Sequence, residues 1–299
     1  MEKMDTVTLL KQVRRIEMRT NRAVDEIFGG AWHSIFRGRG VEFDEVREYS
    51  DGDEVRDIDW SVTARTGRPF VKKYVEEREL SVMLLVDASA SEHFGGRGRN
   101  TKLACGVECA AMLALSAVRN HDKVGMALFT DRIERFIPPA GGRKHSLRLI
   151  REMLGFRPAS RLTDINAALR EIYQIQKRRS IIFLISDMEG STADYAKALR
   201  LVNSRHDVVA VRISDGNELR APAGFGGNFM DPETGMICRL SPAGRDMGEY
   251  ARLRKEEVAR VRETCADARV DMVDMTTEED PVTALTGFFR RRSVRRRSL

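Results

Sequence analysis

The segment Ser81–Ser89, which reads SVMLLVDAS, decides the fold of this chain. Its apolar run is short and nearly continuous, which is typical of a strand buried on both faces of a parallel sheet. Three further runs of the same kind follow, at residues 123–130 (KVGMALFT), 180–186 (SIIFLIS) and 206–214 (HDVVAVRIS). Apolar residues at helical spacing separate these runs and predict helices near residues 101–119, 145–154, 163–177 and 192–204.

This alternation of strands and helices predicts one α/β domain over residues 81–289. Parallel strands joined by helices require right-handed crossovers, so we expect a doubly wound, mostly parallel sheet with helices on both faces. Residues 216–243 contain Gly, Pro and the string PETG, which predicts an inserted hairpin. A charged helix at 244–268, a strand at 269–275 and a short last helix near 280–290 complete the domain.

Two segments precede this domain. Residues 1–37 are expected to be helical, because apolar positions recur at helical spacing over residues 6–28. Residues 38–80 mix turn residues with β-formers, and we expect a small β-rich module there with Trp60 buried. The acidic cluster at 51–59 lacks the glycine of an EF-hand loop, so its carboxylates are interpreted as turn residues paired with arginines.

The positive charge of the chain is concentrated at its C-terminus. The formal net charge is +6, and residues 290–299 hold six arginines and no acid, so the side chains of the rest of the chain balance. We interpret this basic tail as a solvated, frayed terminus. Nucleic-acid binding through the tail is an alternative function, although no aromatic side chain lies between the arginines to stack on bases.

The remaining composition points to the cytoplasm. The four cysteines are scattered and lack the spacing of a zinc site, which fits a reducing compartment. The N-terminus is charged throughout and does not resemble a signal peptide. No stretch approaches the roughly 20 apolar residues that span a bilayer. We therefore expect a soluble, cytoplasmic protein without a membrane span.

Three places in the sequence supply oxygen-bearing side chains near the carboxyl ends of the predicted strands. Asp87, Ser89 and Ser91 follow the strand SVMLLV, Thr163 opens a helix, and Asp187 follows the strand SIIFLIS. Ligands of doubly wound sheets bind at the carboxyl ends of the strands. Two carboxylates and three hydroxyls form an all-oxygen set, which hard divalent cations prefer, with water completing the coordination. The sequence therefore predicts a divalent metal site for magnesium, with manganese or calcium as alternatives.

This constellation resembles the metal-ion-dependent adhesion site (MIDAS) of von Willebrand factor A domains, in which Asp-x-Ser-x-Ser precedes a distant threonine and a distant aspartate. The resemblance implies that the three residues of the short motif bind the metal directly. It also implies that Thr163 and Asp187 bind it directly or through water. Asp164 is assigned instead to the N-terminus of the helix that it opens, where a carboxylate suits the helix dipole.

The strings FRGRGVEFDEVREYSDGDEVRDIDWSVTARTG (36–67) and VKKYVEERE (71–79) resemble the bacterial family known as domain of unknown function 58. Members carry this block ahead of a von Willebrand factor A-type domain and are commonly encoded beside AAA+ ATPases of the MoxR type. The resemblance covers residues 30–215 well, and it implies a metal-dependent adaptor or co-chaperone for such an ATPase. The hydrophobic segments of the longer, membrane-anchored relatives are missing from this sequence.

We expect the metal to bind a protein partner that supplies an acidic side chain. A metal-dependent hydrolase or phosphatase is the alternative, and it would need a general base or a second metal ion. The histidine that lies closest after the metal motif is His93, and neither a GxSxG elbow nor a GxxxxGKS/T phosphate loop occurs. The sequence thus contains no recognisable catalytic constellation, and a binding module is the leading hypothesis.

Overall fold

The computed structural model of the chain describes residues 11, 13, 14, 16–18, 41–50, 52–76, 79–94, 101–190, 192–219, 227–240 and 245–297. The chain divides into two compact units. The smaller unit is Phe36–Leu80, and the larger unit comprises Met1–Ile35 and Ser81–Leu299.

Six strands form the central sheet of the larger unit, in the order β10-β7-β6-β3-β4-β5. All neighbours in this sheet are parallel except β5, which runs antiparallel to β4. The strands are β3 (Ser81–Asp87), β4 (Lys123–Phe129), β5 (Ile133–Ala140), β6 (Ile181–Ser186), β7 (Asp207–Ser214) and β10 (Asp271–Thr276). The chain builds outward from β3 to β5 and then returns to the other side of β3, so the switch in strand order lies between β3 and β6. The predicted doubly wound, mostly parallel sheet is confirmed.

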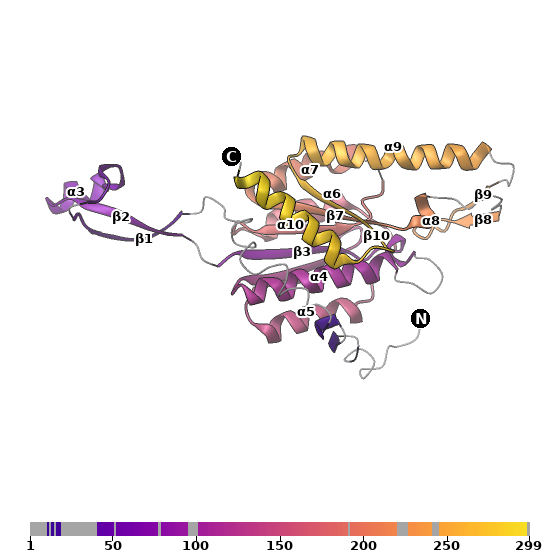
Figure 1. Ribbon diagram of the computed structural model, residues 1–299, viewed down its shortest axis with the longest axis horizontal. Coiled ribbons are helices and arrows are strands. Elements are labelled where there is room, and N and C mark those ends of the chain that lie inside the picture. Colours follow the sequence, from indigo (N-terminus) through magenta and orange to yellow (C-terminus); the bar gives the residue numbers. More distant parts are fainter. Residues whose placement is uncertain are drawn as a thin grey trace. The chain divides into compact units, whose positions relative to one another are not determined.

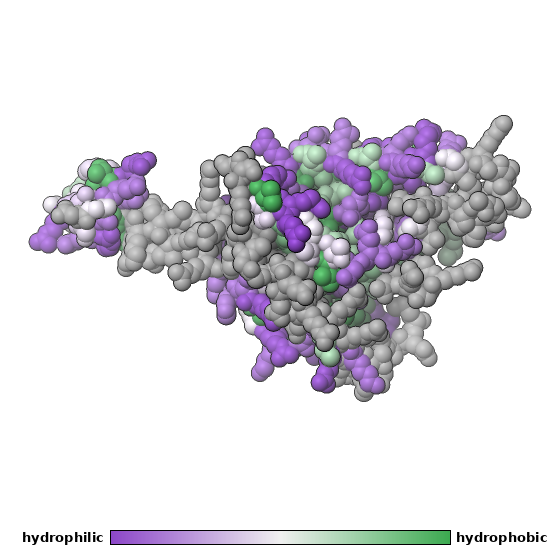
Figure 2. All heavy atoms as spheres, in the orientation of Figure 1, coloured by the Kyte–Doolittle hydropathy of each residue, from purple (hydrophilic) through white to green (hydrophobic). Residues whose placement is uncertain are grey.

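Helices cover both faces of this sheet (Figure 1). On one face, α4 packs against β3 and β4 and also contacts α5 and α10, whereas on the other face α7 contacts α6 and α9. The helices are α4 (Lys102–Arg119), α5 (Arg143–Gly155), α6 (Ile165–Ile175), α7 (Thr192–Arg205), the single turn α8 (Gly216–Leu219), α9 (Arg245–Asp267) and α10 (Pro281–Arg297). Hydrophilic side chains dominate the outer surface of the described helices in the view of Figure 2.

Burial on two faces explains the continuous apolar run of β3. Met83 and Leu85 belong to a core cluster that α6, α7 and α9 complete. Val82, Leu84 and Val86 alternate with them and are equally buried, so they face the layer of α4. Each such side chain contributes about 1.5–3 kcal/mol when it is fully buried. The central strand is thereby fixed, and with it the position of the residues that follow it.

A short hairpin lies between β7 and α9 in the sequence. Its strands, β8 (Gly227–Met230) and β9 (Ile237–Leu240), pair antiparallel. The turn between them is organised by Asp231, whose carboxylate accepts hydrogen bonds from the backbone N–H of Glu233 (2.9 Å) and from the hydroxyl of Thr234 (2.7 Å). Gly235 completes the turn with a φ of 74°, which favours glycine.

The smaller unit is a second hairpin with one short helix. β1 (Val41–Glu48) pairs antiparallel with β2 (Phe70–Glu76), and their connection holds the 3-10 turn η1 (Val55–Asp57) and the helix α3 (Trp60–Thr66). Within the connection, Asp53 pairs with Arg47 of β1 at 2.7 Å, and Glu54 pairs with Arg56 at 3.0 Å. These acids are turn residues paired with arginines, as the sequence predicts.

The prediction that Trp60 is buried is wrong, because 66% of this residue is exposed. Asp59 caps α3 by accepting hydrogen bonds from backbone N–H groups of the first turn, which makes Trp60 the first residue of the helix. The half-buried residues Val62 and Thr63 lie on the inner face instead. The hydroxyl of Thr63 accepts a hydrogen bond from the backbone N–H of Phe70 on β2 at 3.0 Å.

Part of the predicted N-terminal helix is described. Residues 11, 13, 14 and 16–18 are helical, and Val13 and Glu17 are buried. The Glu17 carboxylate accepts a hydrogen bond from Nε of Arg143 at 2.7 Å, which attaches this helix to α5. The rest of the segment 1–37 lies outside the described residues. Among all the described helices, none is both long and apolar enough to cross a bilayer.

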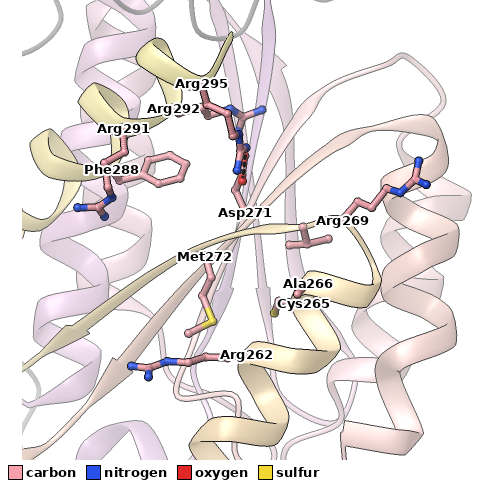
Figure 3. Close-up of a pocket in the computed structure, with 11 residues that line it drawn as sticks. Arg262, Cys265, Ala266, Arg269, Asp271, Met272, Phe288, Arg291, Arg292 and Arg295 are labelled. Carbon is pink, nitrogen blue, oxygen red and sulfur yellow. Dashed lines mark hydrogen bonds and ion pairs between the residues drawn. The ribbon is translucent and has the colours of Figure 1, made fainter. Parts of the chain in front are cut away.

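The C-terminal arginines extend the last helix, so the predicted helix end near 290 and the frayed basic tail are wrong. Helix α10 continues to Arg297, and Arg292 is only 5% exposed. Its guanidinium donates to Asp207 at the start of β7 and lies 3.3 Å from Asp271 at the start of β10. Arg295 also bonds Asp271, and Figure 3 shows both arginines reaching it from α10. Helical spacing places these two side chains on the face that Phe288 already buries.

Replacing Arg292 with alanine should therefore destabilise the protein. The substitution removes the charge-assisted contacts of Arg292 with Asp207 and Asp271. We expect it to lower the free energy of unfolding by about 1.5–3 kcal/mol. Arg290 is exposed on the same helix, so Arg290→Ala is the matched control and should change stability by less than about 0.5 kcal/mol. Urea unfolding of both variants measures the difference, and equal midpoints would contradict an anchored C-terminus.

Candidate metal centre

The carboxyl ends of β3 and β6 form the switch point of the sheet, and side chains from both ends converge there. Asp87 is the last residue of β3. In the turn that follows, the backbone N–H of Ser89 donates to Oδ1 of Asp87 at 2.9 Å, and the hydroxyl oxygens of Ser89 and Ser91 lie 3.1 Å apart. All three side chains are buried. The alternate spacing of the motif thus brings its three members to one place.

Asp187 follows β6 and joins the same cluster. The hydroxyl of Ser186 donates to Oδ2 of Asp87 at 2.8 Å, which links the two strand ends. One carboxylate oxygen each from Asp87, Asp187 and Glu92 lie within 4.8 Å of one another, and all three residues are buried. The structure therefore brings together four of the five predicted ligands and adds a third carboxylate, that of Glu92.

Thr163, the fifth predicted ligand, lies in the neighbouring loop. The carbonyl of Arg161 in this loop accepts a hydrogen bond from the backbone N–H of Ala90, at 3.0 Å, so the loop touches the Asp-x-Ser-x-Ser turn. The Thr163 hydroxyl donates to Oε1 of Glu233 at 2.7 Å. Within the described part of the chain, no hydrogen bond joins Thr163 to Asp87. Asp164 caps α6 by accepting from a backbone N–H of its first turn, as predicted.

Glu92 is a member of the cluster that the sequence prediction missed. It lies in the 3-10 turn η2 (Ser91–His93), is 2% exposed, and accepts a hydrogen bond from the backbone N–H of Asp187 at 2.8 Å. Its position directly after Ser91 was the available signal, but a carboxylate in a loop usually faces water. His93, next in sequence, is exposed.

Lys102 is a second residue that the sequence prediction missed. It is the first residue of α4 and is fully buried. Its ammonium donates to Oδ2 of Asp187 at 2.7 Å and to Oε1 of Glu218 on α8 at 2.8 Å. A lysine at a helix N-terminus opposes the helix dipole, which was the available signal. Lys102 thus supplies a fixed positive charge behind the carboxylate cluster.

An ion-pair network extends from Lys102 to the long helix α9. Glu189 lies 3.8 Å from the ammonium of Lys102 and also pairs with Arg254 of α9. Arg254 pairs in turn with Glu257 at 2.9 Å. The end of the β6 loop is therefore held between α4, α8 and α9, which fixes the backbone on either side of Asp187.

Like charges dominate the electrostatics of the cluster. Burial, followed by the charge of Asp187, raises the pKa of Asp87 from 3.8 to about 7. Burial and the same neighbour also raise the pKa of Glu92 well above its usual range. Burial alone would lower the pKa of Lys102, but Asp187 and the surrounding glutamates raise it overall, so the ammonium stays charged. One ammonium does not balance the negative charge of three carboxylates. A divalent cation would supply the missing positive charge, and hard cations prefer oxygen ligands such as these.

The comparison with protein families agrees with the sequence resemblance. The sequence model of the family described as "Protein of unknown function DUF58" matches residues 45–261. The chain belongs to the DUF58 family. The matched range begins in the smaller unit and ends in α9, so both units of this DUF58 protein carry family features.

The curated relatives of this DUF58 protein include two mycobacterial chains. The uncharacterized protein Rv1480 of Mycobacterium tuberculosis is 28% identical over 288 residues, which is 95% of this chain and 90% of the relative. The uncharacterized protein Mb1516 of Mycobacterium bovis matches with the same identity and coverage.

Solved structures similar to this DUF58 protein include BatB of Bacteroides thetaiotaomicron, with 13% identity and a TM-score of 0.43 over 72% of this chain and 99% of that one. A von Willebrand factor type A structure from Catenulispora acidiphila has 14% identity and a TM-score of 0.38, over 75% and 43% of the two chains. The mussel byssus protein PTMP1, described with a zinc-occupied MIDAS motif, has 14% identity and a TM-score of 0.36, over 46% and 39%.

If magnesium binds this cluster, its affinity should rise with pH. The ion must displace the proton that Asp87 retains up to a pKa of about 7. A single carboxylate of that pKa makes the affinity about 10-fold weaker at about pH 6 than at about pH 8, because protons compete only below the pKa. Calorimetric titrations with magnesium measure both values, and equal affinities would contradict the expectation.

In the presence of a chelator, the proton on Asp87 should affect the free energy of unfolding. This effect should run in the opposite direction with pH to the effect on magnesium affinity. The unfolded chain releases the Asp87 proton near pH 3.8, whereas the fold retains it to about pH 7, so the folded state binds more protons in this interval. The contribution of Asp87 to the free energy of unfolding should therefore fall as pH rises from about 4 to about 7, and the difference in unfolding free energy between the parent and Asp87→Asn isolates it. Saturating magnesium should reduce this loss, because it replaces the proton on Asp87.

Proposed function

We propose that this protein is a metal-dependent protein-interaction module. A divalent cation held by Asp87, Ser89, Ser91, Thr163 and Asp187 would bind a carboxylate of a partner protein. The observation that supports the proposal is the buried cluster of carboxylate and hydroxyl oxygens at the switch point between β3 and β6. Magnesium is the expected ion, with manganese or calcium as alternatives, because hard cations prefer oxygen ligands.

The charges of the cluster suit a divalent cation. Asp87, Glu92 and Asp187 carry three negative charges when ionised, and Lys102 offsets one of them. A divalent cation balances the remaining two. The ion would then keep exchangeable water ligands, and a partner carboxylate could replace one of them. Exclusion of water at the interface strengthens this attraction.

The partner that we propose is a AAA+ ATPase of the MoxR type, with this chain as its adaptor or co-chaperone. Support for the partner comes from the family resemblance, since members are commonly encoded beside such ATPases. Support for binding rather than hydrolysis comes from the site, where the described neighbours of the carboxylates are serines, a lysine and backbone groups. Lys102 is held between two carboxylates and keeps its proton, so it cannot act as a base.

The proposal is tested by capture of a purified MoxR-type ATPase on the immobilised chain. Binding should be lost in excess EDTA and should return when magnesium is added in excess of the chelator. Ser89→Ala should weaken binding, because it removes a hydroxyl from the cluster. Ser204→Ala, on the exposed side of α7, is the matched control and should bind as the parent does. Capture that is equally strong in EDTA would remove the metal from the mechanism.

A further inference from the structure

We propose that Glu233 is an internal carboxylate of the metal site, and that it takes the place that the proposed function gives to a partner carboxylate. The β8–β9 hairpin would then cover the metal until a partner displaces it. This inference rests on the proposed function, and it adds a ligand and a mode of regulation to the same site.

Direct contacts place the turn of the hairpin on the metal-site loop. Oε1 of Glu233 accepts a hydrogen bond from the hydroxyl of Thr163 at 2.7 Å. Next to it, the carbonyl of Pro232 accepts a hydrogen bond from Nη2 of Arg161 at 2.6 Å. The carbonyl of the same Arg161 bonds the backbone N–H of Ala90, inside the Asp-x-Ser-x-Ser turn. Glu233 is therefore the acidic side chain that meets the one predicted ligand lying outside the carboxylate cluster.

The turn is shaped to present this glutamate. The carboxylate of Asp231 accepts hydrogen bonds from the backbone N–H groups of Glu233 and Thr234, and from the Thr234 hydroxyl. Backbone hydrogen bonds from Asp231 to Met236 and from Gly235 to Asp231 close the turn at 2.8 Å each. These local bonds hold the turn independently of Thr163, so the conformation that presents Glu233 does not depend on the contact itself.

The described contacts between the hairpin turn and the metal-site loop are polar, and three large apolar side chains of the hairpin are exposed. Met230 is 61% exposed, Met236 is 71% exposed and Ile237 is 64% exposed. The described contacts that join the turn to the metal-site loop are single hydrogen bonds, and contacts of this kind open at low free-energy cost. The hairpin can therefore leave the site without unfolding the sheet, and a partner that docks there would meet these exposed side chains.

Tethering makes Glu233 an effective competitor of a partner carboxylate. A carboxylate on the same chain binds at a high effective concentration, so an external carboxylate must bind better or displace the hairpin through additional contacts. The apparent affinity of the external ligand equals its intrinsic affinity multiplied by the fraction of molecules whose site is open. Neutralising Glu233 should thus open the metal to small carboxylates.

The test uses the full chain loaded with Mn²⁺, whose effect on water-proton relaxation reports the number of bound waters. In Glu233→Gln, the relaxation enhancement should increase, because water replaces the carboxylate. Sodium acetate should lower the enhancement of this variant at a concentration about 10-fold below that needed for the parent. Arg161→Ala, which removes the contact to Pro232, should change both readings in the same direction. Glu249→Gln, an exposed acid of α9, is the matched control.

The outcomes separate this inference from the proposed function. If Mn²⁺ binds the parent and Glu233→Gln with the same relaxation enhancement and the same response to acetate, Glu233 is not a ligand and the metal site stands without it. If Mn²⁺ binds neither protein, both the metal site and the internal ligand are wrong. A higher enhancement in Glu233→Gln, with the control unchanged, supports both.

Discussion

Asp87→Asn should abolish magnesium binding and should stabilise the protein in the presence of a chelator. The carboxylate of Asp87 is buried against those of Asp187 and Glu92, so its negative charge is unfavourable until a cation arrives. Asparagine has nearly the same shape and can keep the hydrogen bonds with Ser89 and Ser186. The substitution therefore removes like-charge repulsion and a metal ligand together. Loss of an outer-shell partner already weakens metal binding by about 10–100-fold, and loss of a direct ligand should exceed this.

Calorimetry and thermal unfolding measure the two effects separately. Magnesium at about 100 times its dissociation constant should stabilise the parent by about 2.7 kcal/mol, and it should not stabilise Asp87→Asn. Asp194→Asn removes an exposed acid from α7 and is the matched control, which should respond to magnesium as the parent does. If Asp87→Asn binds magnesium with parental affinity, Asp87 is not a ligand.

Lys102→Met should cause the largest loss of stability. The ammonium is fully buried between Asp187 and Glu218, and methionine keeps the volume of the side chain but not its charge. Removal of one partner from a buried ion pair leaves an uncompensated charge and costs about 3–5 kcal/mol. Lys197→Met, at an exposed position of α7, is the matched control and should change stability by less than about 0.5 kcal/mol.

Two further measurements test whether charge is the cause of this loss. Magnesium should restore part of the stability of Lys102→Met, because the ion supplies positive charge beside Asp187. The double substitution Lys102→Met with Asp187→Asn should also be more stable than Lys102→Met alone, since it removes the unpaired carboxylate. A Lys102→Met protein as stable as the parent in chelator would show that the ion pair does not contribute.

The fold could be predicted from the sequence because its signals are local. The strand Ser81–Asp87 is apolar at every position before Asp87 except the first, and this pattern is typical of a strand buried on both faces. The intervening helices then leave a parallel sheet as the simplest arrangement. Since Asp87 and Asp187 each follow such a strand, their meeting at the switch point was also predictable, and one oxygen of each belongs to the cluster.

The missed features depend on contacts between distant residues. Lys102 bonds Asp187, which lies 85 residues later in the sequence. Thr163 bonds Glu233, which lies 70 residues later. Neither pair leaves a periodic pattern in the sequence. Arg292 has the same character, because a run of arginines has the composition of a solvated tail until Asp207 is placed beside it. The prediction that Trp60 is buried was wrong for a local reason, because the cap at Asp59 sets which face of the helix points inward.

Diffraction from a crystal of the parent protein soaked in Mn²⁺ tests the central claim most directly. We expect one strong peak in the anomalous difference map, bounded by the side chains of Asp87, Ser89, Ser91 and Asp187. A fully occupied manganese ion elsewhere, or no anomalous peak at this cluster while the Lys102–Asp187 ion pair keeps its 2.7 Å separation, would contradict the metal-dependent mechanism.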